Sequence, residues 1–409
     1  MKSIITSIDL GSDNIKVVVG EIYKNKLFVL ASNEAKGRGI KQGIVTNEEA
    51  ASKALKSCLK KVEDILGFKI DKAILTLPSY SAVYIKGEGY TQVDGEVTGV
   101  DITKALQASV YKRVSPNLEL VSVTPKDFTL DNEELVKDPK GRETTRLLVN
   151  SVLATVPKKN VEGAIELLEK NGIKVVDLAF GLLADYYAYR TKEMQYKLGA
   201  VINIGEYKTE IGIVNEDLLV ASDVIDLGGR NVDRDISYIY DIPLEDSKHL
   251  KEEFALSYKS KSSAQEIREV LTKDGETIKI NQYEVSEIVY SRMREILETA
   301  KKSINLLTKG EISYIIITGG MTEIEGFQKV YREIFGKDRK ANELRVLGCR
   351  NNKYSTSLGF IKLYSDKLKF REKEAYTVSE EDAESLSAEK KKIDENSLLG
   401  KVYGYFFDN

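Results

Sequence analysis

The feature that most constrains this fold is a pattern of strand, glycine turn and strand that occurs twice. It reads "IITSIDLGSDNIKVVVGEIY" at residues 4–23 and "VINIGEYKTEIGIV" at residues 201–214. Runs of Ile and Val are typical of strands, and a glycine between two such runs is typical of a tight turn. A third strand pattern follows each hairpin. The two copies therefore predict an α/β chain built from two similar halves around a cleft.

Helical and strand patterns elsewhere complete the two halves and add a third unit. From about Tyr84 the pattern of apolar and polar residues changes. It predicts a strand, a helix and two strands, which would form a small inserted subdomain. We expect helices at 46–68 and 181–194, a helix followed by a strand at 158–180, a polar helical region at roughly 231–311, a strand, glycine turn and helix at 312–336, and a last helix at 354–364.

These patterns divide the chain into six parts, and its 409 residues with 42% hydrophobic content are enough for more than one core. We expect a first lobe at 1–83 and 161–198, the inserted subdomain at 84–160, a second lobe at 199–230 and 312–365, a further subdomain at 231–311, a flexible charged linker at 366–395 and an amphipathic helix at 396–409.

Composition excludes several classes of function. A net charge of −3 gives no overall attraction to nucleic acid, so we expect no nucleic-acid partner. The only histidine is His249, which argues against histidine-based metal sites and catalytic triads. Two distant cysteines indicate a reducing compartment. No stretch approaches the roughly 20 apolar residues that span a bilayer, so any membrane contact should be peripheral.

The first glycine turn has the residue types of a phosphate site. Gly11 allows close backbone approach, and the turn amides with Ser12 and Asn14 can surround phosphate oxygens. Lys16 can reach a terminal phosphate. Asp9, at the end of a strand, can hold the water shell of Mg²⁺, which binds few carboxylates and keeps several waters.

Two later segments repeat this chemistry. The second hairpin carries Gly205 at its turn and Thr209 four residues on. The stretch "YIIITGGMTEIEGF" places Gly319 and Gly320 between a buried strand and a helix, where a glycine pair admits a flat ring near a helix N-terminus. Three such segments in this order predict one composite site.

The order of "SIDLGSDNIKVVVGE", "INIGEYKTEIGIV", "LGGRNVDRDI" and "IIITGGMTEIEGF" resembles the two phosphate loops, connecting hairpin and adenosine loop of the actin/Hsp70/sugar-kinase ATPase superfamily. The stretch "EAKGRGIKQGIVTNEEAA" and the insert resemble the FtsA family of bacterial cell division proteins. This resemblance implies an actin-like two-lobed fold that binds ATP and Mg²⁺. It implies that the nucleotide contacts Gly228 and Gly229, Lys251, and Met321 beside Gly319 and Gly320. It also implies that Asp9 binds the metal through water, with Asn203 nearby.

Three departures from the superfamily pattern weaken the case for hydrolysis. Asn203 stands where the second phosphate loop usually has Asp, and an amide orders metal-bound water less well than a carboxylate. The stretch "FGLLADYYAYR" offers no evident Gln or Glu to orient water. Lys248 occupies a position where Glu is common. We therefore expect ATP binding with slow or absent hydrolysis.

The chain ends in an apolar stripe after a charged, polar run. On a helical wheel one broad face carries Leu398, Leu399, Val402, Tyr403, Tyr405, Phe406 and Phe407. Such a helix can dock on its own globule, bind a groove on a partner, or lie in a membrane interface. The linker favours the membrane, since a self-docking helix needs no long reach. The FtsA resemblance favours it too.

The resemblance implies a cell division protein that self-associates and tethers FtsZ to the cytoplasmic face of the cell membrane at the division site. The 231–311 subdomain would bind the FtsZ C-terminal peptide, and the insert would contact neighbouring subunits or later division proteins. One alternative is a PilM-like type IV pilus assembly protein, which leaves the tail unexplained. Another is a small-molecule kinase of the same superfamily, which needs a general base and a substrate pocket where this chain has its insert.

Overall fold

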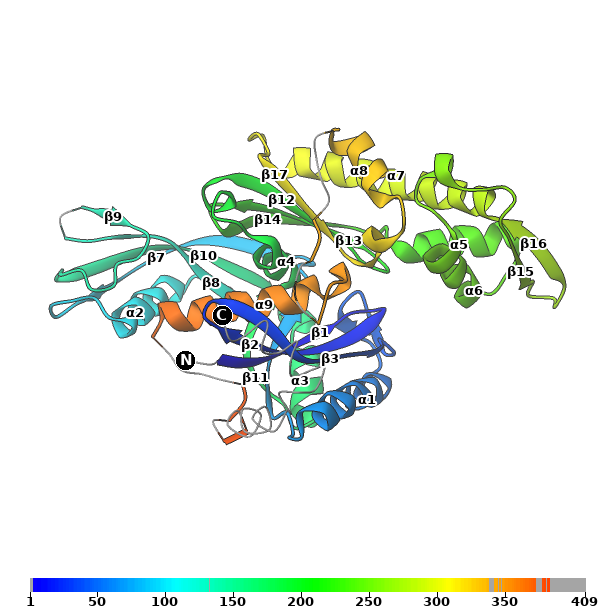
Figure 1. Cartoon of the computed structure of the whole chain (residues 1–409). Coiled ribbons are helices and arrows are strands. Elements are labelled where there is room, and N and C mark those ends of the chain that lie inside the picture. Colours follow the sequence, from blue (N-terminus) through cyan, green and yellow to red (C-terminus); the bar gives the residue numbers. More distant parts are fainter. Residues whose placement is uncertain are drawn as a thin grey trace, which may run out of the picture.

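The computed structural model describes residues 3–131, 133–337, 342–344, 346, 348–372, 377–379 and 381–382. It has two α/β lobes, one above the other in Figure 1, with a smaller sheet unit at one side. The predicted actin-like plan of two lobes and an insert is confirmed. The predicted tail helix at 396–409 and most of the predicted linker lie outside the described residues.

The first lobe contains a five-stranded sheet in the order β11-β6-β1-β2-β3. Its strands are β1 (Ser3–Leu10), β2 (Asn14–Tyr23), β3 (Lys26–Lys36), β6 (Lys72–Leu77) and β11 (Lys174–Phe180). Helices α1 (Glu48–Leu66) and α3 (Glu162–Lys170) cover one face, and α9 (Ser355–Phe370) covers the other (Figure 1). A small hairpin of β4 (Ile40–Lys41) and β5 (Ile44–Val45) precedes α1. Because both faces are covered, the central strands are almost wholly buried, including the polar Thr6 and Ser7 of β1.

The second lobe repeats this plan with a four-stranded sheet in the order β14-β13-β12-β17. Its strands are β12 (Leu198–Ile204), β13 (Thr209–Asn215), β14 (Leu218–Ile225) and β17 (Tyr314–Thr318). In each sheet the first hairpin strand pairs antiparallel with the second and parallel with a later strand. Helices α4 (Gly181–Tyr189) and α7 (Gln282–Leu307) contact this sheet, and α8 (Phe327–Phe335) packs against α7. The duplicated plan expected from the two glycine hairpins is confirmed.

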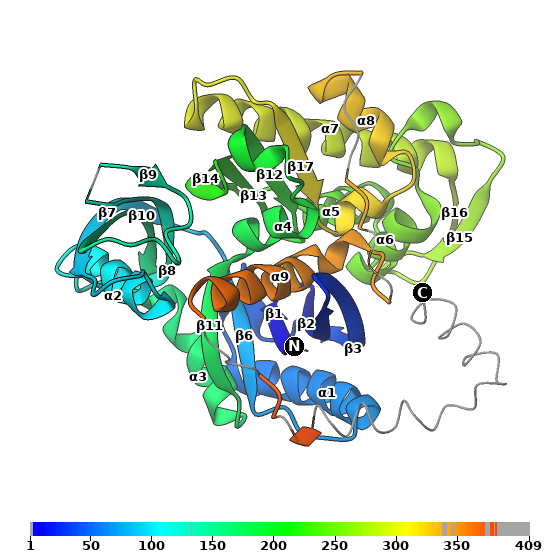
Figure 2. The same cartoon turned by 60° about the vertical axis from the view of Figure 1, so that its left-hand side comes forward.

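The insert is a four-stranded antiparallel sheet with one helix across it. It consists of β7 (Val83–Gln92), α2 (Gly99–Val110), β8 (Leu118–Thr129), β9 (Leu135–Val136) and β10 (Arg146–Pro157), in the sheet order β7-β10-β8-β9. The predicted strand, helix, strand and strand are present, and β9 is a short addition in the polar loop. Figure 2 shows the insert projecting from the side of the molecule, away from residues 231–311.

Residues 231–311 are not helical throughout, in contrast to the prediction from the sequence. In chain order, the region contains helices α5 (Gly229–Tyr240) and α6 (Leu244–His249) and a π-helical turn (Leu250–Phe254). A hairpin of β15 (Ile267–Leu271) and β16 (Thr277–Asn281) follows, and then α7. The stretch "TKDGET" between these strands is an Asp-Gly turn, with Gly275 at a φ of 85°. Ile280 from the hairpin is buried in the core of the second lobe.

The last helix is longer than predicted, and the chain beyond it returns to the first lobe. We expected a linker from residue 366, but α9 continues to Phe370 because Leu368 is buried and Phe370 packs on Phe128 of the insert, with ring centroids 5.9 Å apart. Thr377 then accepts a hydrogen bond from the Thr6 amide at 2.6 Å, and Val378 is buried in the core of the first lobe. Within the described residues, no helix is both long and apolar enough to cross a bilayer.

Candidate nucleotide site

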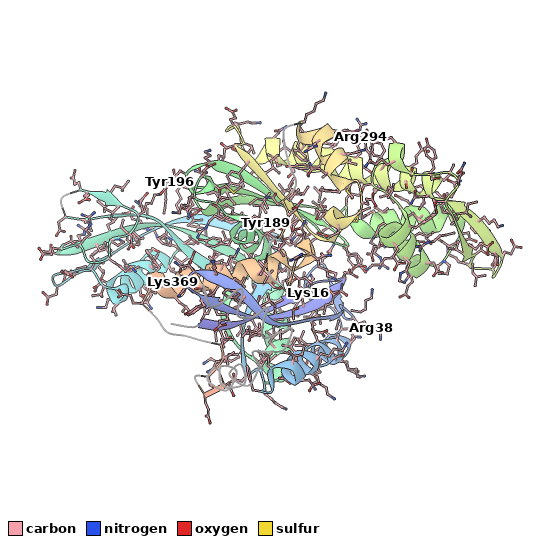
Figure 3. The ribbon with its side chains drawn as sticks, in the orientation of Figure 1. Lys16, Arg38, Tyr189, Tyr196, Arg294 and Lys369 are labelled. Atoms are coloured by element: carbon pink, nitrogen blue, oxygen red, sulfur yellow. The ribbon has the colours of Figure 1, made fainter. Side chains whose placement is uncertain are left out.

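A cavity of about 540 Å³ lies between the two lobes. Its walls come from the turn between β1 and β2, the turn between β12 and β13, the start of α5, the end of α6 with the π-helical turn, the turn after β17, and the first turn of α9. Lys16 of β2 lies on the side of the first lobe that faces the second lobe (Figure 3). The segments that the sequence analysis singled out therefore meet at one place.

The first glycine turn is held by an ion pair at its base. The Lys16 amine lies 3.1 Å from an Asp9 carboxylate oxygen, and the Thr76 hydroxyl donates to the other Asp9 oxygen at 2.9 Å. Burial alone would lower the pKa of Lys16, but the charge and hydrogen bond of Asp9, with the charges of Glu34 and Asp13, raise it above its usual range. Lys16 is therefore a fixed cation in the cavity wall.

A second ion pair crosses the cavity between the lobes. Lys248 at the end of α6 donates to Asp13 in the first turn. Burial would raise the pKa of Asp13, but the hydrogen bond and charge of Lys248 outweigh this effect and hold the pKa below its usual range. The pKa of Lys248 is raised, since Asp13 outweighs the lowering effect of burial. Lys248, noted above as a departure, therefore neutralises a carboxylate within the phosphate turn.

The second glycine turn adds a cation that sequence reasoning missed. The Lys208 side chain is 10% exposed and lines the cavity, and its amine has no hydrogen-bond partner among the described residues, although Glu210 lies 3.5 Å away. Glu210 accepts from the amide and hydroxyl of Ser79 in the first lobe, at 2.7 and 2.8 Å. These contacts connect the two lobes at the cavity wall.

Lys251, on the π-helical turn, lines the cavity from the second lobe. It is 4% exposed, lies 2.7 Å from Asp233 and donates to the Gly229 carbonyl at 3.4 Å. Burial raises the pKa of Asp233 despite this cation. The π-helical turn and the start of α5 thus form one charged wall of the cavity.

The glycine pair after β17 closes the other side. Gly319 has a φ of 100°, a conformation that L side chains rarely adopt, and an added Cβ would lie 2.9 Å from the Asn203 Oδ1 atom. Gly320 and Met321 line the cavity beside it, and Met321 is almost fully buried. An added Cβ at Gly319 would also lie 2.3 Å from the Ile204 carbonyl oxygen, whereas one at Gly320 would meet no atom within 4 Å.

Most of the predicted site residues lie on the cavity wall, and two do not. Those that line it are Asp9, Gly11, Ser12, Asn14, Lys16, Asn203, Gly205, Gly229, Lys251, Gly319, Gly320 and Met321. Thr209 is buried, and its hydroxyl donates to the Leu227 carbonyl at 2.8 Å. Gly228 lies just outside the wall, where its amide donates to the Asn231 side chain at 3.0 Å.

Sequence reasoning predicted the helix at 354–364 but not that its start lines the cavity. Ser355 and Thr356 of α9 and Asn352 just before it line the cavity, and Asn352 accepts from the Tyr189 hydroxyl at 2.7 Å. The signal was the run of polar residues in "NNKYSTSLGF" before an apolar helix, which is typical of a helix start.

The chemistry of this wall suits a nucleotide with a magnesium ion. Fixed lysines and turn amides suit phosphates, and the glycine pair leaves room for a ring. Among the described residues, no three His, Cys, Asp or Glu side chains cluster as they would around a metal held by the protein alone.

Comparisons with known proteins agree with this architecture. The family model for cell division protein FtsA matches residues 200–359, and the model for the SHS2 domain inserted in FtsA matches residues 81–155, so together they span more than half of the chain.

Curated relatives match over most of their own length. The chain is 26% identical to cell division protein FtsA of Enterococcus hirae over 359 residues, which covers 87% of this chain and 81% of that protein. It is 25% identical to FtsA of Bacillus subtilis, with coverage of 87% and 82%.

Solved structures with the same fold include actin-like ATPases. The PilM–PilN type IV pilus biogenesis complex gives a TM-score of 0.58 at 15% identity, covering 88% of this chain and 98% of the matched chain. MreB5 of Spiroplasma citri bound to ADP gives 0.54 at 14% identity, covering 90% and 98%. These likenesses show an actin-like fold. The matches to both FtsA family models and to the curated FtsA relatives show that the chain belongs to the FtsA family of cell division proteins.

Proposed function

We propose that this chain binds ATP with Mg²⁺ between its lobes, self-associates, and tethers FtsZ filaments to the cytoplasmic face of the cell membrane through residues 396–409. The observation that carries the proposal is the cavity, where the two glycine turns and the glycine pair of an FtsA family chain converge. The fold is also that of an MreB crystallised with ADP.

In this proposal the cavity residues bind and orient the nucleotide. Gly11, Ser12 and Asn14 surround phosphate oxygens, and Lys16 supplies charge to the terminal phosphate. Gly319 and Gly320 with Met321 border the adenosine. When bound, Mg²⁺ would neutralise phosphate charge, and Asp9 would hold its water shell. Hydrolysis is slow or absent, since the amide of Asn203 orders water less well than a carboxylate.

Residues 231–311 provide the surface for FtsZ. Their exposed large apolar side chains are Tyr238, Ile239, Ile267, Leu271, Tyr283 and Leu306. Tyr238 is 87% exposed and adjoins the exposed Ile239, so the two side chains offer apolar contact area to a partner. A peptide with apolar anchors fits these side chains. Replacing Ile239 with Asp should abolish capture of the protein by the immobilised FtsZ C-terminal peptide, whereas Tyr111→Asp on the insert, also at an exposed apolar position, should not.

The tail provides the membrane contact, and self-association strengthens it. Large apolar side chains contribute about 1.5–3 kcal/mol each when fully buried, and an interfacial helix buries them only in part. One tail therefore binds reversibly, whereas several tails on one polymer bind firmly through effective concentration.

Flotation with anionic liposomes tests this function. The full chain should float, more so with ATP, whereas a chain ending at Glu395 should not. That truncation retains Thr377 and Val378, which pack on the first lobe, so the globular part stays intact. Phe406→Glu on the apolar face should abolish flotation, and Asp408→Glu on the polar face should leave it unchanged. Equal flotation of the full and truncated chains would refute membrane tethering by the tail.

A further inference from the structure

A buried carboxylate lies directly behind the cavity wall, although it does not line the cavity. Asp185 of α4 has no exposed surface. It accepts hydrogen bonds from the Asn203 amide at 2.6 Å, the Ser355 hydroxyl at 2.6 Å and the Thr356 hydroxyl at 2.8 Å. All three donors line the cavity. One carboxylate therefore holds three cavity-lining side chains, from β12 and from the first turn of α9.

The chemistry of a carboxylate determines which way the Asn203 amide points. An ionised carboxylate only accepts hydrogen bonds, so Asn203 must turn its nitrogen to Asp185. Its oxygen then lies on the other side, near Gly319, where an added Cβ would be 2.9 Å from it. The Asn203 side chain therefore lines the cavity, and its amide oxygen does not take part in the contact with Asp185.

Burying a carboxylate in this way reduces the free energy of unfolding. Burial raises the pKa of Asp185 to about 6, with a further contribution from the charge of Asp9, while the three donors lower it. A charged group without exposure must be hydrogen-bonded or paired, and replacing it with a well-packed apolar residue often costs nothing in stability. The nearby Asp217 offers a comparison, because it binds Tyr186 and Arg190 at the same helix and does not contact the cavity wall.

We propose that Asp185 is a positioning residue for the nucleotide cavity. It keeps the Asn203 oxygen directed toward the side where a magnesium ion and its waters would bind. It also holds Ser355 and Thr356 in the same wall. Asn203 carries no negative charge where the second phosphate loop usually has one. The carboxylate of Asp185 supplies that charge directly behind Asn203. This inference rests on the proposed nucleotide binding.

The test exchanges the carboxylate of Asp185 and the amide of Asn203. Four variants are compared with the full-length wild type: Asp185→Asn, Asn203→Asp, the double exchange, and Asp217→Asn as a matched control that contacts the same helix. Two quantities are measured for each: the thermal unfolding midpoint, and the ratio of Kd values for a fluorescent, slowly hydrolysed ATP analogue without and with Mg²⁺.

Asn203→Asp should have the lowest unfolding midpoint, because it places two carboxylates in contact. The double exchange should restore that midpoint, because the amide introduced at position 185 can then donate to the carboxylate introduced at position 203. Asp185→Asn should reduce the Mg²⁺ ratio at least fivefold, since the Asn203 amide is then free to turn over. The double exchange should raise the ratio above that of the wild type, since the charge then lines the cavity. Asp217→Asn should lower the midpoint but leave the ratio unchanged.

An unchanged Mg²⁺ ratio in Asp185→Asn would refute the positioning role and leave nucleotide binding intact. A double exchange no more stable than Asn203→Asp would also refute it. If the wild type fails to bind the analogue, the proposed function itself is wrong.

Discussion

Lys248 and Asp13 form an ion pair across the nucleotide cavity, joining the end of α6 to the first glycine turn. The two residues are 235 positions apart in the chain. In the proposed nucleotide site, the Asp13 carboxylate would repel a phosphate, and Lys248 offsets that charge. The pair would therefore allow this turn to accept a phosphate although it contains an acid.

Removing either partner should affect nucleotide affinity in opposite directions. Lys248→Ala removes the closest cation from Asp13, leaving the exposed Lys36 at 4.0 Å, and should weaken binding about tenfold, or about 1.4 kcal/mol, at low salt. Asp13→Asn should tighten it. The double variant Asp13→Asn with Lys248→Ala should lie near the wild type. Titration with a fluorescent ATP analogue at two salt concentrations measures this, and weaker binding in both single variants would contradict it.

Lys16→Ala should nearly abolish nucleotide binding, because it removes a buried cation and leaves Asp9 facing the phosphates with only the Thr76 hydrogen bond. We expect a loss of more than about tenfold in affinity by isothermal titration. Lys36→Ala is the matched control, since Lys36 also lines the cavity but its side chain is 60% exposed. Equal losses in the two variants would mean that only overall charge matters.

Gly359→Ala should disrupt the contact between the lobes. Gly359 lies within α9 where it crosses α4, and an added Cβ would overlap the Ala184 carbonyl oxygen. We expect a loss of stability of several kcal/mol, or no folded protein, because backbone must move. Gly163→Ala in α3 is the control. Its nearest neighbour would be the Val45 Cβ at 3.7 Å, so it should stabilise by about 0.4–1 kcal/mol. Urea unfolding measures both, and a folded, stable Gly359→Ala protein would contradict the packing argument.

The titration of Asp185 should make the wild type lose stability, relative to Asp185→Asn, as the pH rises. The folded pKa of Asp185 is about 6, raised by burial from 3.8. A raised carboxyl pKa means that the folded protein binds the proton more tightly than the unfolded chain does. The resulting stabilisation is complete below about pH 4 and is lost as the pH passes through about 6.

Urea unfolding from about pH 4 to about pH 7 measures this effect. The stability of the wild type minus that of Asp185→Asn should fall by about 3 kcal/mol at most. Asp101→Asn provides a contrast. The pKa of Asp101 is lowered, because hydrogen bonds from Thr98 outweigh the effect of burial, so the corresponding difference should rise with pH. A flat difference for Asp185 would contradict the proposed burial.

The sequence by itself determined the parts of the fold that depend on neighbours in the chain. The two glycine hairpins were predictable because alternating apolar runs and a glycine specify a turn locally. The insert was predictable for the same reason. The Asp-Gly turn between β15 and β16 was a local signal that was missed, because the surrounding mixed charges masked the strands.

Only the tertiary structure decided which charges meet. The pairing of Lys248 with Asp13, of Asp185 with Ser355, and of Ser79 with Glu210 joins residues distant in the chain. No periodicity encodes such contacts, since they depend on how two sheets and the helices α4 and α9 pack together. The end of α9 was misjudged for the same reason, because its last turn is stabilised by Phe128 of the insert and not by its own polar sequence.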